Sequence, residues 1–448
     1  MFRGLRLARP ETGIMDQVAP AAAASRAPVS WTGQARDRMA ARFGFLDRPL
    51  TDFYLVLGIT TLLVALGLVM VLSTSSAADL MAGSSPWSGL QHQLLGVLIG
   101  LPCLWLAARS SPGRYRAAAY PLMFISLLGL VVVLFVTPTQ GSGGAARWLQ
   151  IAGFQFQPSE LAKFAFLLWG ADLLTRKEKL NQLGDWRQLL IPLLPGVGFL
   201  AMLVMLGDDL GTTFVLLIIF LTLLWIIGTP GRVFAGILVL IGLALLAMVV
   251  VAPYRIERLL GFFHASGNPV GQNQQPIQGK WAVGSGGWFG VGLGASREKW
   301  GWVPESTTDF IFAILGEELG LVGTLCVTFL YAGLAYAGLR IARRVQDTFM
   351  RLAAGGATAW IVGQALVNIC AVIGLLPITG VPLPLVSEGL SSLLVTMVAL
   401  GMLMSFAKRE PGASQALTEA GPGAGPRVLS WLGLAGRRKT PAGPGRRR

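Results

Sequence analysis

Long apolar runs alternate with short polar segments over most of the chain. A membrane-spanning helix needs roughly 20 mostly apolar residues, and nine runs approach or exceed that length: 53–73, 88–108, 117–136, 189–206, 211–228, 233–252, 319–339, 352–376 and 390–407. A tenth, weaker run at 160–174 contains Lys163 and Asp172. It must be counted as a span for the Lys and Arg residues to fall in alternate loops. The pattern predicts an all-α polytopic membrane protein with ten transmembrane helices.

Lys and Arg gather in alternate loops, as the positive-inside rule describes for cytoplasmic loops. The loops after the second, fourth, sixth and eighth spans carry these residues: Arg109, Arg114, Arg116; Arg176, Lys177, Lys179, Arg187; Arg232; Arg340, Arg343, Arg344, Arg351. The loops at 74–87, 207–210 and 377–389 carry none, and the loop at 137–159 carries only Arg147. Both termini are therefore expected in the cytoplasm, with one large extracytoplasmic loop at 253–309.

Composition supports a membrane protein, because 53% of the residues are apolar and 13% are charged, with a mean hydropathy of +0.62. Soluble domains carry about 25% charged residues. A disordered chain, a collagen and a cytosolic enzyme are therefore excluded. The net charge of +14 lies mostly in residues 1–50 and 408–448, which carry +4 and +7. This placement fits anionic lipid at the cytoplasmic face, and no nucleic-acid partner is expected.

These charges also define the expected domains. Residues 1–50 and 409–448 are rich in Ala, Pro, Gly and Arg, which is typical of disordered, here basic and cytoplasmic, tails. Residues 51–408 form the membrane domain. No cleavable signal peptide is recognised at the start of the chain. The glycine-rich stretch at 284–294 lacks the spacing of a nucleotide loop, so it is interpreted as backbone that approaches a ligand or a helix closely.

Ionisable side chains at membrane depth are costly and therefore indicate function. They are Glu160, Lys163, Asp172, Asp208, Asp209, Glu317, Glu318 and Glu388. Most fall near the predicted outer ends of spans, as do Arg147, Lys299 and Asp309 in the adjoining loops. A polar site at the outer leaflet is the expectation. The alternative for Glu160, Asp172 and Glu388 is an interfacial cap or a snorkelling side chain.

Asp309 stands where the long loop enters the eighth span, in the segment PESTTDF at 304–310. At that position it is either a helix N-cap or a general base whose partial burial offsets the acidifying helix terminus. Lys163 likewise has two interpretations. It either contacts substrate or forms an i, i+3 salt bridge with Glu160 that only braces the helix.

Six groups of residues resemble motifs of the SEDS family (shape, elongation, division, sporulation). They are GAARW at 144–148 with FQPSELAK at 156–163, DLGTT at 209–213, GVGLG at 290–294 with Lys299, PESTTDFIFA at 304–313, EELG at 317–320, and GLLPITG at 374–380 with PLP at 382–384. Three motifs depart from the family pattern. Thr307 replaces a usual histidine, Gly207-Asp208 precedes Asp209, and Glu388 and Leu390 alter the segment at 387–392.

The resemblance implies a ten-span peptidoglycan glycosyltransferase at the cytoplasmic membrane of a bacterium. It would polymerise lipid II at the outer face of the membrane, at the division septum, and release undecaprenyl diphosphate. The implied partners are a class B penicillin-binding protein, which supplies the transpeptidase, and other divisome proteins. Asp309 matches the family's proposed catalytic aspartate, and five residues match substrate-binding positions: Arg147, Lys163, Lys299, Glu305 and Glu160.

The implied reaction joins a sugar hydroxyl to an anomeric carbon that carries a diphosphate, and it requires a base and positive charge. A diphosphate leaves as a stable anion, so one carboxylate suffices, and cationic side chains or a divalent cation (Mg²⁺ or Mn²⁺) neutralise the leaving group. No cofactor is otherwise expected. The alternatives are an elongation-type polymerase of the same family, a lipid II flippase, which needs polar groups at the bilayer midplane, and a scaffold that only recruits a transpeptidase.

Overall fold

The computed structural model describes residues 50–136, 147–151, 154–251 and 274–413. All of them fall in one compact unit, Pro49–Arg448. The tails expected at 1–50 and 409–448 lie outside the described residues except for residue 50 and residues 409–413. The expected loop at 253–309 is described from residue 274 onward.

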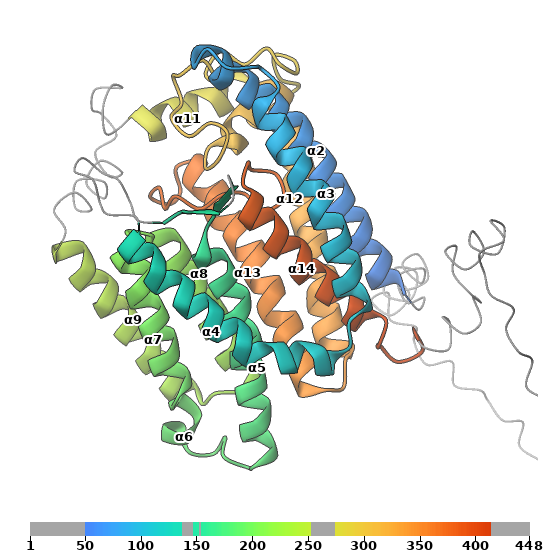
Figure 1. The fold of residues 1–448 in the computed structure, drawn as a ribbon, viewed down its shortest axis with the longest axis vertical. Helices are drawn as coiled ribbons and strands as arrows, with labels where there is room; N and C mark the ends of the chain where they lie inside the picture. The colour runs from blue at the N-terminus through green and yellow to red at the C-terminus, as the bar shows by residue number, and fades with distance from the viewer. Residues whose placement is uncertain (1–49, 137–146, 152–153, 252–273, 414–448) are drawn as a thin grey trace, which may run out of the picture. The chain divides into compact units, whose positions relative to one another are not determined.

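Helices make up most of the described chain (Figure 1). In sequence order they are α2 (Thr51–Met81), α3 (Ser88–Arg109), α4 (Pro112–Val136), α5 (Pro158–Lys179), α6 (Trp186–Leu190), α7 (Leu193–Leu206), α8 (Leu210–Ile227), α9 (Gly231–Val251), α11 (Gln274–Ser285), α12 (Ile311–Arg344), α13 (Thr348–Val372) and α14 (Leu390–Ala407). Between α4 and α5, β1 (Leu149–Ile151) and β2 (Phe154–Phe156) form an antiparallel pair in which Leu149 faces Phe156. This small hairpin was not expected from the hydropathy pattern.

Each of the ten expected spans overlaps a helix. In the described part of the chain, eight helices are long and apolar enough to cross a membrane, with α6 and α7 taken as one. The two others are α9, whose apolar part is described over Gly231–Ala244, and α5, which carries charged side chains. The chain therefore has the predicted polytopic helical fold, and the count of ten stays a prediction.

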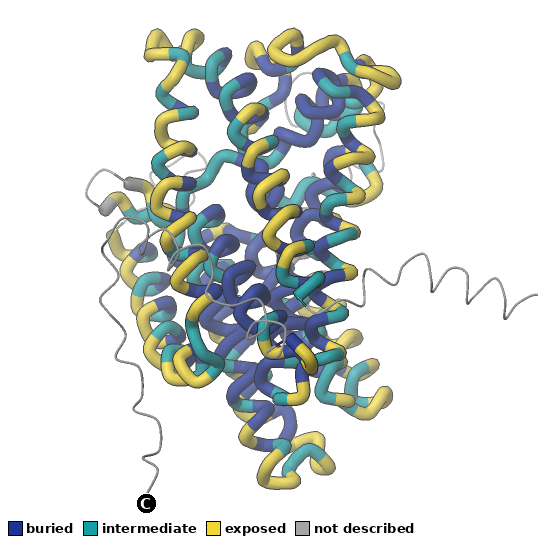
Figure 2. The backbone as a smooth tube through the Cα atoms, turned by 90° about the vertical axis from the view of Figure 1, so that its right-hand side faces the viewer, coloured by how far each residue is buried: buried dark blue, intermediate teal, exposed yellow. Residues whose placement is uncertain are grey.

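The centre of the bundle is formed by α13 and α14. In the most apolar stretch of each, 78% of the residues are buried, against 28% in α4. Buried residues gather in the middle of the bundle and exposed residues along its outside (Figure 2). Small residues allow close packing at the centre: a Cβ added at Gly401 of α14 would lie 2.5 Å from Leu104 O of α3. Peripheral helices expose large apolar side chains such as Phe124 and Phe135. Close contacts through small residues and an apolar exterior are typical of helices in lipid.

Helix α12 is kinked at Gly320, whose φ of 68° and ψ of −163° are not helical. The glycine-rich segment at 286–292 packs against this kink and satisfies its backbone: Val291 N and Gly292 N donate to Glu317 O and Glu318 O, at 3.0 and 3.1 Å. A Cβ at Gly290 would lie 2.1 Å from Glu318 O. The interpretation of 284–294 as backbone that approaches a helix closely is confirmed.

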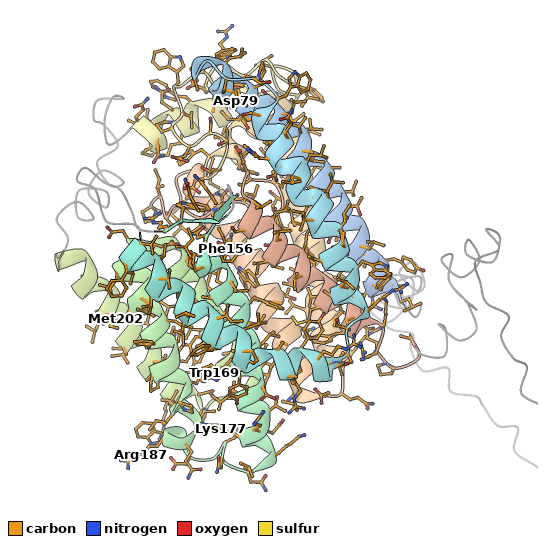
Figure 3. All side chains as sticks on the ribbon, in the orientation of Figure 1. Asp79, Phe156, Trp169, Lys177, Arg187 and Met202 are labelled. Carbon is orange, nitrogen blue, oxygen red and sulfur yellow. The ribbon has the colours of Figure 1, made fainter. Side chains whose placement is uncertain are left out.

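Side chains from the predicted outer and inner loops lie at opposite ends of the bundle. Asp79, at the end of α2, is at one end, whereas Lys177 and Arg187 are at the other (Figure 3). This separation is the one that the alternation of basic loops predicts. The separation is consistent with the prediction that the outer and inner loops face opposite sides of the membrane.

Cysteine labelling should report this topology directly. In a chain whose Cys103, Cys326 and Cys370 are replaced by alanine, Ala295→Cys should react with a membrane-impermeant maleimide in intact cells. Leu180→Cys, in the loop after α5, should react only after lysis, although both positions are exposed. Labelling of Leu180→Cys in intact cells would contradict the ten-span arrangement.

Candidate active site

Asp309 lies in a series of turns immediately before α12, which begins at Ile311. The residue is half-buried, and its carboxylate faces Gly380, where an added Cβ would lie 3.5 Å from Asp309 Oδ2. The N-cap residue of α12 is Phe310, whose side chain makes no capping hydrogen bond. Asp309 precedes that position by one residue, and its carboxylate stays a candidate base.

Lys163 is buried in the first turns of α5. Its Nζ lies 2.7 Å from Glu160 Oε1 and 3.0 Å from Gln364 Oε1, and 5.3 Å from the centre of the Trp360 ring. Lys163 is 1% and Glu160 2% exposed. The i, i+3 salt bridge of the bracing alternative is therefore present. An ammonium this deeply buried requires such partners, because burying an unpaired charge is costly.

Helix α13 connects this pair to Asp309 through amide side chains on one face, at four-residue spacing. Gln364 accepts from Lys163 and from Trp360 Nε1 (3.0 Å), and its Nε2 donates to Pro382 O (2.9 Å). One turn further, Asn368 Nδ2 donates to Asp309 O, at 2.7 Å. The Lys163 pair and the Asp309 segment thus attach to the same face of one helix.

Gln364 and Asn368 are absent from the sequence-based prediction, which considers only ionisable side chains. Their signal was nevertheless available. Two amides four residues apart in an apolar span share a helix face, and each is costly to bury without hydrogen-bond partners. Such a pair indicates that this face of the helix meets polar groups.

Asp209 connects two of the quoted motifs in space, FQPSELAK at 156–163 and DLGTT at 209–213. It is the N-cap of α8, and its carboxylate accepts from Thr212 N (2.9 Å), Thr212 Oγ1 (2.7 Å), Gln157 Nε2 (2.9 Å) and Ser159 Oγ (3.2 Å). The start of α5 is thereby held against the start of α8. Nearby, the half-buried Arg147 donates from Nε to Gly207 O (3.2 Å) and from Nη2 to Asp208 O.

Glu305 lies within the Asp309 segment, and Glu388 N donates to Thr307 O of that segment at 3.0 Å. Glu305 is exposed, accepts from Thr308 Oγ1 at 2.7 Å, and has a φ of 56°, which is uncommon for a residue other than glycine and tends to occur at functional sites. Burial raises the pKa of Glu388, although a hydrogen bond with Thr307 opposes the shift. The family departures at Thr307 and Glu388 therefore contact each other.

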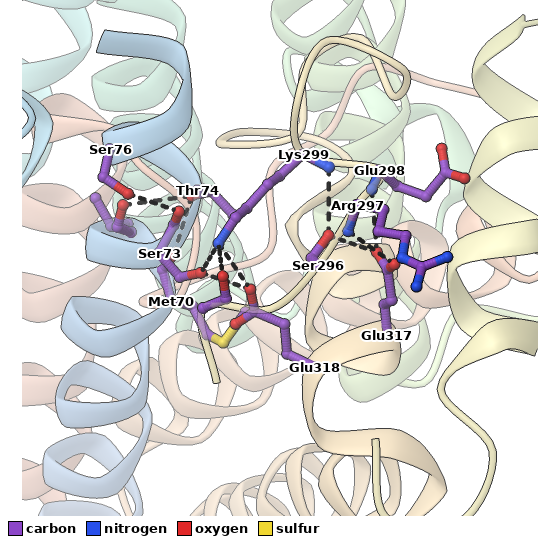
Figure 4. Close-up of polar contacts among 12 residues, drawn as sticks. Met70, Ser73, Thr74, Ser76, Ser296, Arg297, Glu298, Lys299, Glu317 and Glu318 are labelled. Atoms are coloured by element: carbon purple, nitrogen blue, oxygen red, sulfur yellow. Dashed lines mark hydrogen bonds and ion pairs between the residues drawn. The ribbon is translucent and has the colours of Figure 1, made fainter. Parts of the chain in front are cut away.

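Lys299 belongs to a separate buried cluster (Figure 4). Its Nζ contacts Gly294 O (2.7 Å), Ser73 Oγ (2.9 Å) and Glu318 Oε1 (3.2 Å), which occupy its three N–H donors. Glu317 accepts from Ser296 Oγ and from Arg297 N (3.0 Å). This cluster fastens the loop at 294–299 to α2 and to the start of α12. It does not bring Lys299 into the polar network of Lys163 and Asp309.

Two cations at this end of the bundle keep N–H donors without a partner among the described residues. Within that part of the chain, Arg147 uses two of its five N–H groups, for the carbonyls of Gly207 and Asp208. Lys280, half-buried on α11, lies beside the end of α13, since a Cβ at Gly374 would lie 2.6 Å from its Nζ. Within the described ranges, no hydrogen bond or ion pair of the Lys280 ammonium is found.

A metal ion would require several ligating side chains at one place. Among the residues that the structure describes, no three His, Cys, Asp or Glu side chains form a group that could hold one. These residues supply no ready ligand set for Mg²⁺ or Mn²⁺. We derive no step through a cation.

The comparison with protein families decides the class. The family described as cell cycle protein, which groups FtsW, RodA and SpoVE, matches residues 53–411. The chain is a SEDS protein. The resemblance found in the sequence motifs is thereby confirmed. The buried contacts of Asp209, Lys163 and Lys299 are thus features of a SEDS membrane domain.

Named SEDS relatives cover most of this chain. The probable peptidoglycan glycosyltransferase FtsW of Mycobacterium tuberculosis is 41% identical over 386 residues, which span 86% of this chain and 73% of that protein. Stage V sporulation protein E of Bacillus subtilis is 36% identical over 361 residues, 80% of this chain and 97% of that protein. The FtsW name of the first of these relatives agrees with the division-type SEDS protein that the motif resemblance implies.

Solved structures share the SEDS fold. The rod shape determining protein RodA of Thermus thermophilus aligns with a TM-score of 0.57 at 28% identity, covering 79% of this chain and 96% of that one. A chain of a peptidoglycan synthase complex, described as coordinating polymerization and crosslinking, aligns with a TM-score of 0.65 at 27% identity over 79% of this chain and 96% of that one. Both likenesses support the polytopic arrangement of the helices.

Proposed function

We propose that this SEDS protein is a peptidoglycan glycosyltransferase that polymerises lipid II at the outer face of the cytoplasmic membrane. The observation that carries the proposal is the half-buried carboxylate of Asp309, held where α12 begins and joined through α13 to the buried Lys163 pair. The name peptidoglycan glycosyltransferase of the FtsW relatives supports the reaction class. Their similarity favours septal synthesis over the elongation role.

The proposed reaction is a single displacement. Asp309 accepts the proton of the acceptor's 4-hydroxyl group as that oxygen forms a bond to the donor's anomeric carbon. The bond between that carbon and the diphosphate oxygen breaks, and undecaprenyl diphosphate leaves as a stable anion. A single displacement inverts the configuration at the anomeric carbon. No second carboxylate is needed to protonate the leaving group, in contrast to glycosidases.

Positive charge would stabilise the departing diphosphate. Among the described residues, Arg147 and Lys280 have donors left for it, whereas Lys163 and Lys299 would contribute from buried positions where each already contacts a carboxylate. Glu305, which is exposed four residues before Asp309, is placed to accept from sugar hydroxyl groups. Glu160 would act indirectly, by holding the Lys163 ammonium.

A class B penicillin-binding protein is the proposed partner, together with other divisome proteins. The complex in which polymerization and crosslinking are coordinated contains a chain of this fold, which supports such a pairing. A transpeptidase domain must sit over the outer face to reach new strands. The proposed location is the septal membrane. The basic loops predict that both termini lie in the cytoplasm, on the opposite side from that domain.

A flippase would carry polar groups through the middle of the bilayer. The polar contacts around Asp309, Lys163 and Asp209 instead join the first turns of α5 and α8, the last turns of α13 and the start of α12. Under the proposed topology, these are outer ends of helices. The placement supports chemistry at the outer face over passage across the membrane.

Purified full-length protein, alone and with its class B partner, should convert labelled lipid II into glycan strands. A preparation that carries Asp309→Asn controls for other polymerases that copurify. We expect strands on a gel and release of undecaprenyl diphosphate in proportion to the bonds formed. Movement of lipid II between leaflets of vesicles without any polymer would favour the flippase and refute the proposal.

A further inference from the structure

Three successive backbone carbonyls in the Asp309 segment are held by one neighbouring surface. The carbonyls of residues 307–309 accept hydrogen bonds, in order, from Glu388 N (3.0 Å), Ser387 Oγ (2.6 Å) and Asn368 Nδ2 (2.7 Å). None of these bonds involves the Asp309 carboxylate. The backbone that presents the carboxylate is therefore fixed independently of the carboxylate itself.

Asn368 and Ser387, which hold two of these carbonyls, also bind the 381–384 loop. Side chains hold every residue of that loop. Four consecutive residues of the 381–384 loop are bound by side chains: Val381 O by Asn368 (2.7 Å), Pro382 O by Gln364 (2.9 Å), Leu383 N by Ser387 Oγ (2.8 Å) and Pro384 O by the Tyr331 hydroxyl (2.5 Å). The partners come from α12, α13 and the loop itself. Asn368 contacts both the anchored loop and Asp309.

The orientation of the Asn368 amide is determined by its two partners. Its NH₂ group donates to the carbonyls of Asp309 and Val381, both at 2.7 Å. A flipped amide would direct its oxygen at two carbonyl oxygens, which is unfavourable. The residue is 3% exposed, and Oδ1 is buried with no partner among the described residues. An unsatisfied buried acceptor is costly. The two hydrogen bonds that the NH₂ group donates must therefore offset this cost.

We infer that Asn368 is a positioning residue, which sets the place of the Asp309 carboxylate by joining the Asp309 carbonyl to the Val381 carbonyl. The inference rests on the proposed function, in which Asp309 is the general base. A base must lie within hydrogen-bond reach of the proton that it accepts. A misplacement of about 1 Å lowers a rate by roughly 100-fold, so loss of this link should affect the chemical step.

The test compares Asn368→Ala with Thr358→Ala in the full chain bound to its class B partner. Thr358 is a matched control, because it is also buried on α13 but donates only to Ala354 O within the helix (2.7 Å). We expect Asn368→Ala to lower kcat on labelled lipid II by about 10- to 100-fold per folded molecule, with little change in KM. Thr358→Ala should keep the parental kcat. A purely structural role of Asn368 would reduce the yield or Tm without lowering kcat per folded molecule.

Asp309→Asn, measured in parallel, separates the two possible failures. If Asp309→Asn is inactive and Asn368→Ala keeps the parental kcat, Asn368 does not position the base and the proposed function stands. If Asp309→Asn stays active, Asp309 is not the general base, and the premise of the inference fails rather than the link through Asn368. Should Asn368→Ala not fold, Asn368→Leu keeps most of the side-chain volume but lacks the NH₂ group that donates to the carbonyls of Asp309 and Val381, and an unchanged kcat in that variant would overturn the inference equally.

Discussion

Asp309→Asn should fold normally, bind its class B partner and lose lipid II polymerisation by about 100-fold or more. A loss of this size corresponds to about 2.7 kcal/mol of transition-state stabilisation. Folding should persist because asparagine has nearly the same size and because the segment is held through its backbone carbonyls, which the substitution leaves in place. Initial rates on labelled lipid II, with Tm and copurification measured on the same samples, provide the check.

Asp347→Asn is the matched control for this substitution. Asp347 is the N-cap of α13 and accepts from Met350 N at 3.0 Å, a role in which asparagine serves about as well. It should keep the parental rate. If Asp309→Asn polymerises lipid II at a comparable rate, the proposed mechanism is wrong, and Glu305, four residues earlier, becomes the next carboxylate to test.

The helices were predictable from the sequence because their length and apolar content reflect the bilayer directly. The kink of α12 and the residue at which this helix begins were not predictable. Hydropathy places the start of that span at 319, since Glu317 and Glu318 interrupt the apolar pattern. In the structure the helix begins eight residues earlier, Glu317 accepts hydrogen bonds from the loop at 294–299, and Glu318 Oε1 contacts Lys299 and Ser73. Partners so distant in sequence leave no local signal.

The candidate site was predictable in part for the same reason. Asp309, Lys163 and Glu160 were recognisable as costly polar groups near helix ends, and the local Lys163–Glu160 pair follows from i, i+3 spacing. Which cations have free donors depends on tertiary contacts. Lys299 is occupied by Ser73, 226 residues away, whereas Lys280 was overlooked and makes no hydrogen bond with its ammonium among the described residues. The links through Gln364 and Asn368 likewise exist only once α13 meets the 381–384 loop.

Lys163→Met should sharply reduce the amount of folded protein. The substitution leaves the Glu160 carboxylate buried and without its cation, and breaking a buried ion pair from one side costs about 3 to 5 kcal/mol. Removing both charges should be far less harmful, because a neutral, well-packed replacement of a buried pair is often nearly neutral. We therefore expect Glu160→Gln combined with Lys163→Met to recover most of the folded protein, measured by size-exclusion profile and Tm in detergent.

The same double variant separates the two interpretations of Lys163, because folding no longer limits the measurement. If Lys163 helps to bind the lipid diphosphate, the folded double variant should show a raised KM for lipid II. A parental KM and kcat would make the pair a brace alone and leave Arg147 and Lys280 as the cations for the leaving group. If the double variant is as poorly folded as Lys163→Met, the unpaired Glu160 charge does not cause the instability, and mutual charge compensation is the wrong account of this pair.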